Sequence, residues 1–223
     1  MILAAVAAGI ALMSRNANAN GEVPMGVAVG DSPTSLDDLS DTSTWYDPDM
    51  PDLIASSDVD QRRAAALYML RSCEHTSAAV ADQTDYQTFY GGTLFWDMSD
   101  HPVNTGELQG VPLPSQVCIN AGFSDGVCVS TAAGAYQFTR PTWDEIRDYG
   151  GSHLPDFTPE SQDAAALRLL AKIGALPLID AGNITAAIPV MGKRWASLPG
   201  AIGKQGQRSV DFALAKFSEG LQA

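Results

Sequence analysis

The chain has 223 residues with a 45% hydrophobic and a 17% charged fraction, which suits one globular domain plus extensions. Its formal net charge of −13 argues against binding to nucleic acid, because neutralising phosphates requires clustered Lys and Arg, and it gives no attraction to anionic lipid. Neither a CxxC pair nor a His cluster occurs, so the sequence predicts no metal site and indicates no cofactor.

The N-terminal segment 1–19 resembles an export signal. Residues 1–13 are apolar, and Ala17-Asn18-Ala19 has the A-x-A pattern of a cleavage site. A helix of that length spans roughly 20 Å, which is short of the ~30 Å hydrocarbon core. No Lys or Arg precedes the apolar run, so the alternative is an uncleaved signal that associates transiently with the membrane through residues 1–13. Both alternatives predict export, to the periplasm or the cell exterior.

Residues 20–57 form a separate acidic segment. They contain eight acidic residues, four prolines and no Lys or Arg, a composition that is a poor core former. We expect an acidic linker or arm, in which Trp45 and Tyr46 could dock on the domain and which could bind a partner protein. The globular domain is then expected over residues 58–223.

The first helix of this domain is predicted to end at an acidic residue. Asp58 and Gln61 have the spacing of a capping box, which starts a helix directly after Asp58. Leu67, Leu70 and Glu74 share one face of that helix. A carboxylate that continues an apolar face is either solvated at a frayed helix end, paired, or an acid with a raised pKa.

A β-hairpin is predicted over residues 86–96. Two aromatic and β-branched runs flank Gly91-Gly92, and both glycines can adopt the positive φ of a tight turn. The following segment 103–130 is rich in Pro and Gly and is expected to be an irregular loop.

The three cysteines differ in their setting. Cys118 and Cys128 lie close together in the 103–130 loop, and we predict a disulfide between them. Cys73 lies on the first helix and is expected to be free and buried. The alternative is three reduced thiols in a cytosolic protein.

The rest of the chain is predicted to be helical. A helix is expected after Thr139, with Pro141 in its first turn, and Thr158 is expected to cap another that stops at Gly174. Further helices are expected after Asn183, where Pro189 should kink or break the helix before Trp195, and over about 209–219.

Six motifs follow one another along the chain: Ser72-Cys73-Glu74-His75-Thr76, Gly91-Gly92-Thr93-Leu94-Phe95, Ser99-Asp100-His101-Pro102, Ser130-Thr131-Ala132-Ala133-Gly134-Ala135-Tyr136-Gln137, Asp156-Phe157-Thr158-Pro159-Glu160-Ser161-Gln162-Asp163 and Trp195-Ala196-Ser197-Leu198-Pro199-Gly200. In this order they resemble the phage lambda endolysin family, over about residues 60–223. The resemblance implies an α+β, mostly α, lysozyme-like fold with a small β-hairpin subdomain beside a helical lobe. The family consists of peptidoglycan lytic transglycosylases, which cleave the bond between N-acetylmuramic acid and N-acetylglucosamine and leave 1,6-anhydro ends.

The chain departs from the family pattern in two places. The family's Ser-Glu-Gly-Thr core here has Cys73 before the acid and His75 after it, which changes the surroundings of Glu74. The 103–130 region is longer than in the family and has its own cysteine pair, which could alter how the cleft closes.

The resemblance assigns Glu74 as the catalytic acid and base. A glycoside hydrolase normally uses two carboxylates, whereas a lytic transglycosylase needs one, because the 6-hydroxyl of the sugar attacks its own anomeric carbon. A pKa raised by apolar neighbours would suit this role, as for the lysozyme acid that is a standard example of the effect. Asp97 and Asp100, at the exit of the predicted hairpin, are the alternative second carboxylates.

Other residues are candidates for binding substrate. The resemblance places Tyr136 and Gln137 in the cleft, and an amide can both donate and accept hydrogen bonds. Structural alternatives apply to several candidates: Asp100 and His101 could shape the turn before a proline, and Trp195 could belong to the core rather than stack on a sugar. Phe95 and Trp96 alternate along the predicted hairpin, so only one of them should reach the cleft. The remaining candidates are Ser130 and Thr131.

The sequence therefore predicts a phage- or prophage-type enzyme that degrades peptidoglycan glycan strands. A muramidase that hydrolyses the same bond is the alternative within the enzyme class. A non-catalytic virion or cell-wall-binding module on the same fold is the alternative outside it.

Overall fold

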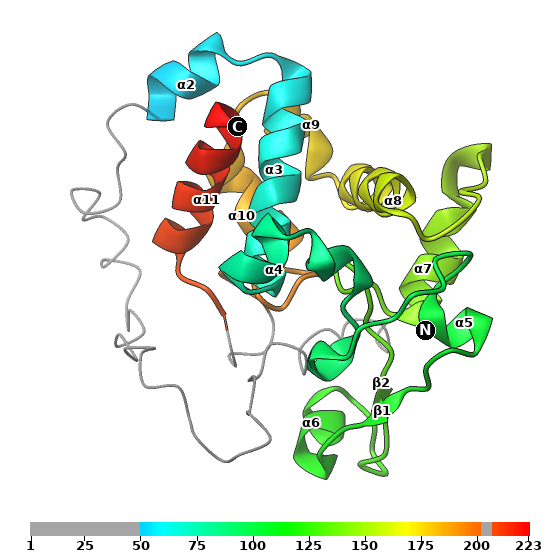
Figure 1. Cartoon of the computed structure of the whole chain (residues 1–223). Helices are drawn as coiled ribbons and strands as arrows, with labels where there is room; N and C mark the ends of the chain where they lie inside the picture. Colours follow the sequence, from blue (N-terminus) through cyan, green and yellow to red (C-terminus); the bar gives the residue numbers. More distant parts are fainter. Residues whose placement is uncertain (1–49, 202–206) are drawn as a thin grey trace.

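The computed structural model describes residues 50–201 and 207–223, a mostly helical chain with a small antiparallel sheet (Figure 1). The predicted signal-like segment 1–19 and residues 20–49 of the acidic arm, with Trp45 and Tyr46, lie outside the described residues. The helices are α2 (Met50–Ser56), α3 (Val59–Glu74), α4 (Ser77–Ala81), α5 (Pro102–Thr105), α6 (Ser115–Asn120), α7 (Arg140–Arg147), α8 (Pro159–Lys172), α9 (Leu176–Asp180), α10 (Ile184–Met191) and α11 (Val210–Gln222). Short 3₁₀ turns are η4 (Thr84–Gln87), η5 (Tyr90–Gly92) and η6 (Tyr149–Gly151), and the strands are β1 (Val111–Pro112) and β2 (Val129–Ser130).

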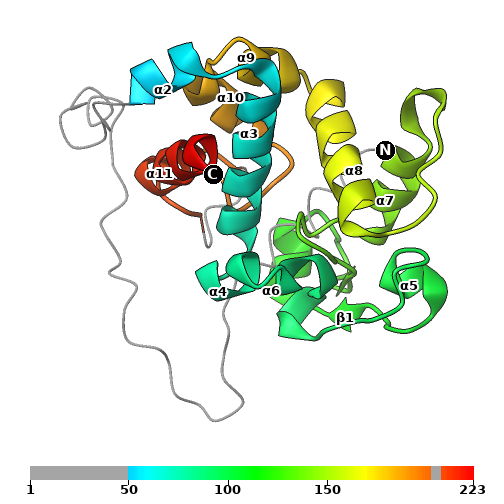
Figure 2. The same ribbon diagram turned by 45° about the horizontal axis from the view of Figure 1, so that its top comes forward.

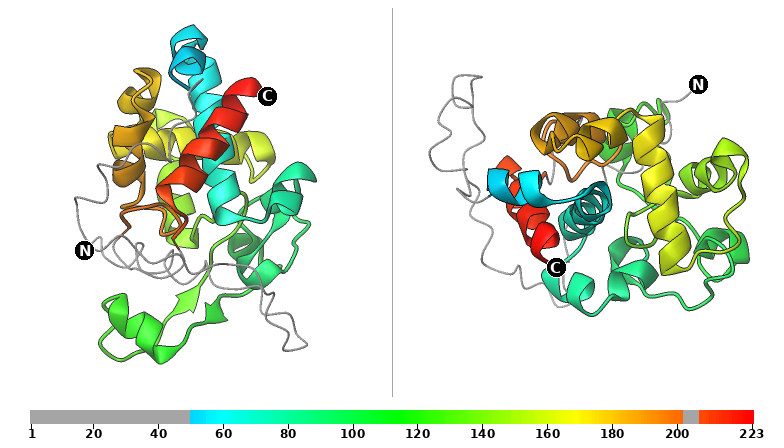
Figure 3. Two further views of the ribbon diagram at one scale, coloured as in Figure 1. Left: turned by 90° about the vertical axis from the view of Figure 1, so that its left-hand side faces the viewer. Right: turned by 90° about the horizontal axis from the view of Figure 1, so that it is seen from above.

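Helix α3 is the centre of the helical lobe, and α11 lies along it (Figures 2 and 3). The predicted capping box is present: the Asp58 side chain accepts from the Gln61 backbone at 2.8 Å, and the Gln61 side chain accepts from the Asp58 backbone at 2.9 Å. The two helices approach closely because α11 has Gly220 at the contact, where a Cβ atom would lie 2.8 Å from the Cα of Ala65. Helix α3 starts beside α2 and ends at Glu74, on the side of the molecule where the small sheet lies (Figure 1).

Helix α2 occupies the last residues of the segment expected to be an acidic linker or arm. It packs against α11, and its first residue, Met50, is buried. The last residues of the expected arm therefore pack against the helical domain.

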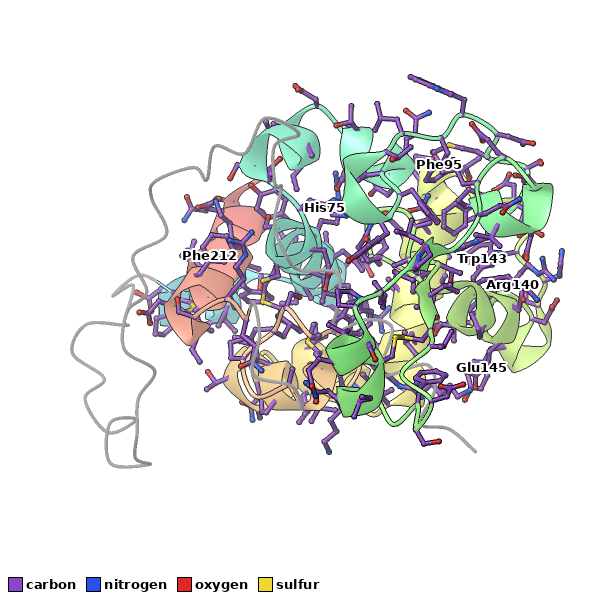
Figure 4. All side chains as sticks on the ribbon, turned by 90° about the horizontal axis from the view of Figure 1, so that it is seen from below. His75, Phe95, Arg140, Trp143, Glu145 and Phe212 are labelled. Atoms are coloured by element: carbon purple, nitrogen blue, oxygen red, sulfur yellow. A yellow bond between two sulfur atoms is a disulfide. The ribbon has the colours of Figure 1, made fainter. Side chains whose placement is uncertain are left out.

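An aromatic core joins α7 and α8 to the chain that follows η5. Trp143 meets Phe157 edge to face with ring centroids 4.6 Å apart, and Phe95 lies 5.8 Å from Phe157. This core belongs to a second lobe, beside the helical lobe formed around α3. Figure 4 looks at the molecule from the side where α3 ends and shows Phe95 and Trp143 in the second lobe and His75 in the helical lobe.

The expected hairpin over 86–96 forms a chain reversal but not two regular strands. The turn occurs at its two glycines as predicted, both with positive φ, and Phe89 donates its backbone N–H to the Thr93 carbonyl at 2.7 Å. The next residue, Tyr90, donates instead to Ala132 at 2.9 Å. Because the backbone here pairs with two different partners, a continuous two-stranded ladder does not develop.

The 103–130 region is more regular than expected. It contains most of α5, together with α6 and the two strands, which pair with Val111 opposite Ser130. The predicted Cys118–Cys128 disulfide is confirmed, with the two Cα atoms 5.5 Å apart, and Cys73 is free and buried as predicted. We call residues 111–130 the disulfide loop. This loop projects from the body of the molecule (Figure 3, left).

Three of the later helices begin after the expected residues: α7 follows Thr139, α8 follows Thr158 and α10 follows Asn183. Helix α11, expected over about 209–219, spans Val210–Gln222, and Gly174 after α8 has a φ of +80°. Helix α10 ends at Met191, two residues after its proline. Helix α9 was not predicted from the sequence, because its five residues are too short for a periodic pattern. Across residues 50–201 and 207–223, none of the helices combines the length and apolar character needed to span a bilayer.

Candidate active site

A pocket lies where α3 ends against the segments that precede α7 and follow α10. Glu74, the last residue of α3, contributes a carboxyl group to a hollow of about 420 Å³ that includes the part open to solvent. The walls are mostly apolar or uncharged, and Glu74 is the sole carboxylate among the described residues that line it. The other lining residues are Tyr136, Gln137, Phe138, Thr139, Thr142, Leu169, Arg194, Trp195 and Ala196.

The surroundings of Glu74 favour its protonated form. Burial raises the pKa of Glu74 to about 7, while a hydrogen bond from Ser197 and the charge of Arg208 partly oppose that rise. The Ser197 hydroxyl donates to Oε1 of Glu74 at 2.5 Å. Cys73 stays a neutral thiol, because burial raises its pKa to about 12. A carboxyl group with a pKa near neutrality can give up and regain a proton within one reaction cycle.

His75 connects the end of α3 to the loop that forms one wall of the pocket. Its ring is buried, and Nε2 lies 3.1 Å from the carbonyl oxygen of Gly134, so this nitrogen donates the hydrogen bond. Burial lowers the pKa of His75. The histidine that departs from the family pattern therefore has a structural contact beside Glu74.

Gln137 lines the pocket in a backbone conformation that is uncommon for a residue other than glycine, with a φ of +47°. Its amide nitrogen donates to the carbonyl oxygens of Thr88 at 3.1 Å and Gly134 at 3.0 Å. Both amide hydrogens are thus taken. Towards a ligand, the side chain can act only as an acceptor, through its oxygen.

Tyr136 and Trp195 line the same pocket but are both almost fully buried. The Tyr136 hydroxyl donates to Asp163 at 2.6 Å, and that carboxylate oxygen also accepts from Tyr86 at 2.8 Å. The Trp195 indole N–H donates to the Tyr136 carbonyl at 3.1 Å. Their polar atoms are therefore committed to protein contacts, and only their apolar surfaces are available to a ligand.

The other predicted site residues lie away from the pocket lining. Ser130 is buried in β2, and the Thr131 hydroxyl accepts from the backbone of Arg140 at 2.9 Å, at the start of α7. Phe95 is buried and Trp96 is exposed, so the two alternate as expected, but neither lines the pocket.

Asp100 and His101 are held by protein contacts. Asp100 accepts from the Trp143 indole at 2.6 Å and from the Arg147 guanidinium at 2.8 Å. His101 is fully buried, its Nε2 donates to the Phe138 carbonyl at 3.1 Å, and burial lowers its pKa to about 4. These bonds place one wall residue of the pocket, Phe138, through its backbone.

Asp97, the other candidate for a second carboxylate, accepts from the backbone and the hydroxyl of Ser99 at an exposed turn. It does not line the pocket.

Several residues of the site were not predicted from the sequence. Ser197 lies within one of the six motifs, which was the signal that could have drawn attention to it. Arg194 lines the pocket just before that motif, and Arg208, whose charge acts on Glu74, lies after it. The other lining residues that were not predicted are Phe138, Thr139, Thr142, Leu169 and Ala196. Among the described residues, no group of three or more His, Cys, Asp and Glu could hold a metal ion.

The end of a helix, a small β subdomain and one acid in a pocket between two lobes define a lysozyme-like protein. Residues 64–221 match the Endolysin family, and the chain belongs to that family. It is therefore a phage-type glycosidase that cleaves peptidoglycan, and the resemblance seen in the motifs is confirmed.

Its relatives agree with this assignment. The endolysin of Escherichia phage lambda is 38% identical over 164 residues, which cover 73% of this chain and 92% of that protein. The endolysin of Escherichia phage P2 is 39% identical over 118 residues, or 53% of this chain and 64% of that protein. Among solved structures, bacteriophage lambda lysozyme complexed with a chitohexasaccharide superposes with a TM-score of 0.57 at 38% identity, covering 72% of this chain and 94% of that chain.

Proposed function

We propose that this protein is a lytic transglycosylase that cleaves the bond between N-acetylmuramic acid and N-acetylglucosamine in peptidoglycan. Its products would be glycans with 1,6-anhydro-muramic acid ends. The observation that carries this proposal is that Glu74 is the sole carboxylate among the described lining residues of its pocket.

The reaction uses Glu74 twice. The neutral carboxyl group protonates the glycosidic oxygen, and the bond from that oxygen to the anomeric carbon of muramic acid breaks. The 6-hydroxyl oxygen of the same sugar bonds to the anomeric carbon, and its proton passes to the Glu74 carboxylate. The acid is thereby regenerated and no water is consumed. A pKa of about 7 suits both halves of this cycle near neutral pH.

The positions of the rival carboxylates support a single-acid reaction. A hydrolase normally has a second carboxylate facing the first across the scissile bond. Asp100 is engaged by Trp143 and Arg147, and Asp97 by Ser99. Neither lines the pocket of Glu74.

The substrate assignment is also supported by one of the solved relatives. The lambda lysozyme structure contains a chitohexasaccharide, an oligomer of N-acetylglucosamine. We propose that the pocket of this chain likewise receives a glycan strand, with the Gln137 oxygen as an acceptor for a sugar N–H or O–H group.

Mass spectrometry of the soluble muropeptides released from purified sacculi tests the proposal. The wild-type protein should release products about 18 Da lighter than hydrolysis products, because water is not added. Glu74→Gln should release none. Hydrated products from the wild-type protein would instead identify a muramidase, and no products at all would favour a non-catalytic binding module.

We further propose that the protein acts after export, in the periplasm or outside the cell, with residues 20–57 as an arm for a possible virion partner. The Cys118–Cys128 disulfide supports an oxidising compartment. Mass measurement of the N-terminus in the periplasmic fraction would test whether residues 1–19 are removed, and detection of the untagged protein in purified particles would test the virion association.

A further inference from the structure

Ser197 holds one oxygen of the Glu74 carboxyl group. The serine is fully buried, and its hydroxyl donates to Oε1 of Glu74 at 2.5 Å. Its backbone is anchored in turn, because the Ser197 carbonyl accepts from the backbone N–H of Arg208 at 2.7 Å. A buried hydroxyl with such a close carboxylate acceptor has one favoured orientation.

The side chain of Arg208 reaches the same end of α3. Its guanidinium lies over the ring of Phe212 at 4.9 Å and donates to the carbonyl oxygens of Cys73 at 3.4 Å and His75 at 3.5 Å. Carbonyl groups in the last turn of a helix have no partner within the helix, and a cation is favourable there. These contacts hold a positive charge close to the carboxyl group of Glu74.

We propose that Ser197 and Arg208 are positioning residues, which determine the oxygen of Glu74 that carries the proton and stabilise the carboxylate left when that proton is transferred. This inference rests on the proposed function, in which Glu74 is the acid and base. Because Oε1 accepts the Ser197 hydrogen bond, the proton lies on Oε2, which becomes the donor to the glycosidic oxygen. When the proton leaves, the Ser197 bond becomes charge-assisted and therefore stronger.

The other groups around Glu74 do not provide this effect. Burial disfavours the carboxylate, and Ser197 and Arg208 are the two groups that act in the opposite direction, by lowering the pKa of Glu74. The Cys73 thiol is neutral, and Arg194 lines the pocket without being a cause of the Glu74 shift. Removing either positioning residue should therefore raise the pKa of Glu74 further.

The test is a titration of the Glu74 side-chain carboxyl carbon by NMR in the full-length protein. Ser197→Ala should raise the Glu74 pKa by about one unit, because a hydrogen bond to a charged group is lost. In turnover assays kcat should fall roughly tenfold with little change in KM, and the alkaline limb of kcat/KM should move to higher pH by the same shift. Arg208→Gln should shift the titration in the same direction, and Arg208→Lys should shift it less.

The chain offers a matched control in Ser161, which is also buried and donates to a carboxylate, that of Asp156, at 2.7 Å. Neither Ser161 nor Asp156 acts on the pKa of Glu74, so Ser161→Ala should leave the Glu74 titration unchanged. Ser197→Thr, which keeps the hydroxyl, should restore most of the wild-type titration.

An unchanged or lowered Glu74 pKa in Ser197→Ala, with a normal thermal unfolding curve, would overturn the inference. If that variant does not fold, the Arg208→Gln titration decides: a rise supports the inference and an unchanged value overturns it. The NMR titration does not depend on turnover. A wild-type protein that releases no anhydro products would therefore refute the proposed function. The NMR titration would still decide whether Ser197 places the proton of Glu74.

Discussion

Replacing the Glu74 carboxyl group by a neutral amide should stabilise the folded protein at neutral and alkaline pH. Burial raises the pKa of Glu74 from its ordinary 4.5 to about 7. The folded state therefore holds this proton more tightly than the unfolded chain, and ionising Glu74 in the pocket costs about 3 kcal/mol, at roughly 1.4 kcal/mol for each pKa unit.

This cost has a defined pH window. Stability from the protonated carboxyl is fully present below pH 4.5 and is lost as pH rises through about 7. Glu74→Gln cannot ionise and avoids the loss, and its amide oxygen can still accept the Ser197 hydrogen bond. The stability difference between Glu74→Gln and the wild-type protein should be constant at low pH, rise across the window, and be constant again above it.

Urea unfolding of both proteins at a series of pH values measures this difference. Any effect of the amide that is independent of pH cancels, because the prediction concerns the rise and not the absolute difference. A stability difference that stays the same from about pH 4 to pH 9 would refute the argument that burial raises the Glu74 pKa.

Three further predictions concern residues away from the reacting atoms. Asp100→Ala should lower the free energy of unfolding by roughly 2–4 kcal/mol and leave the product chemistry unchanged, because it removes a partly buried partner of three side chains, those of Asn104, Trp143 and Arg147. The pKa of Asp100 is lowered from 3.8, so its contribution to stability is present above that pH and lost below it. Tyr136→Phe should cost about 1–3 kcal/mol of stability by leaving Asp163 with one donor fewer, with little change in KM. Reducing the Cys118–Cys128 disulfide should remove a loop constraint that stabilises the folded protein by roughly 3 kcal/mol. The main effect should be faster proteolysis within residues 111–130, with a smaller effect on the melting temperature.

Each of these predictions has a contrary outcome. Loss of turnover in a folded Asp100→Ala protein, or a change of its products to hydrated ones, would assign Asp100 to the chemistry. A large rise in KM for Tyr136→Phe would mean that its hydroxyl contacts the glycan. Simultaneous loss of all structure on reduction would show that the disulfide loop and the core unfold together.

The features that the sequence predicted correctly depend on residues that are close along the chain. Asp58 and Gln61 are three residues apart, so their capping box marks the start of α3 without knowledge of the rest of the fold. The disulfide joins cysteines separated by ten positions in a segment with turn residues. The reversal at the glycines of the 86–96 segment follows from their tolerance of positive φ.

The roles of individual side chains depended on distant partners. The sequence left open whether Asp100 was a second acid, and its partner Trp143 lies 43 positions away. It named Tyr136 as a cleft residue, but the hydroxyl of that residue is committed to Asp163, 27 positions further on. Local patterns carry no information on which donor a given carboxylate will meet.

The sequence by itself determined where α3, α7, α8 and α10 begin, the disulfide, and the position of Glu74 at the end of a helix, because caps and turn residues are short-range features of the chain. Only the tertiary structure decided that Glu74 has a pKa near neutrality. That value results from the burial of its carboxyl group and from a hydrogen bond to Ser197, 123 positions later in the chain. Such an environment exists only when α3 is packed against the segments that follow α10, since desolvation and hydrogen bonding depend on distances in space.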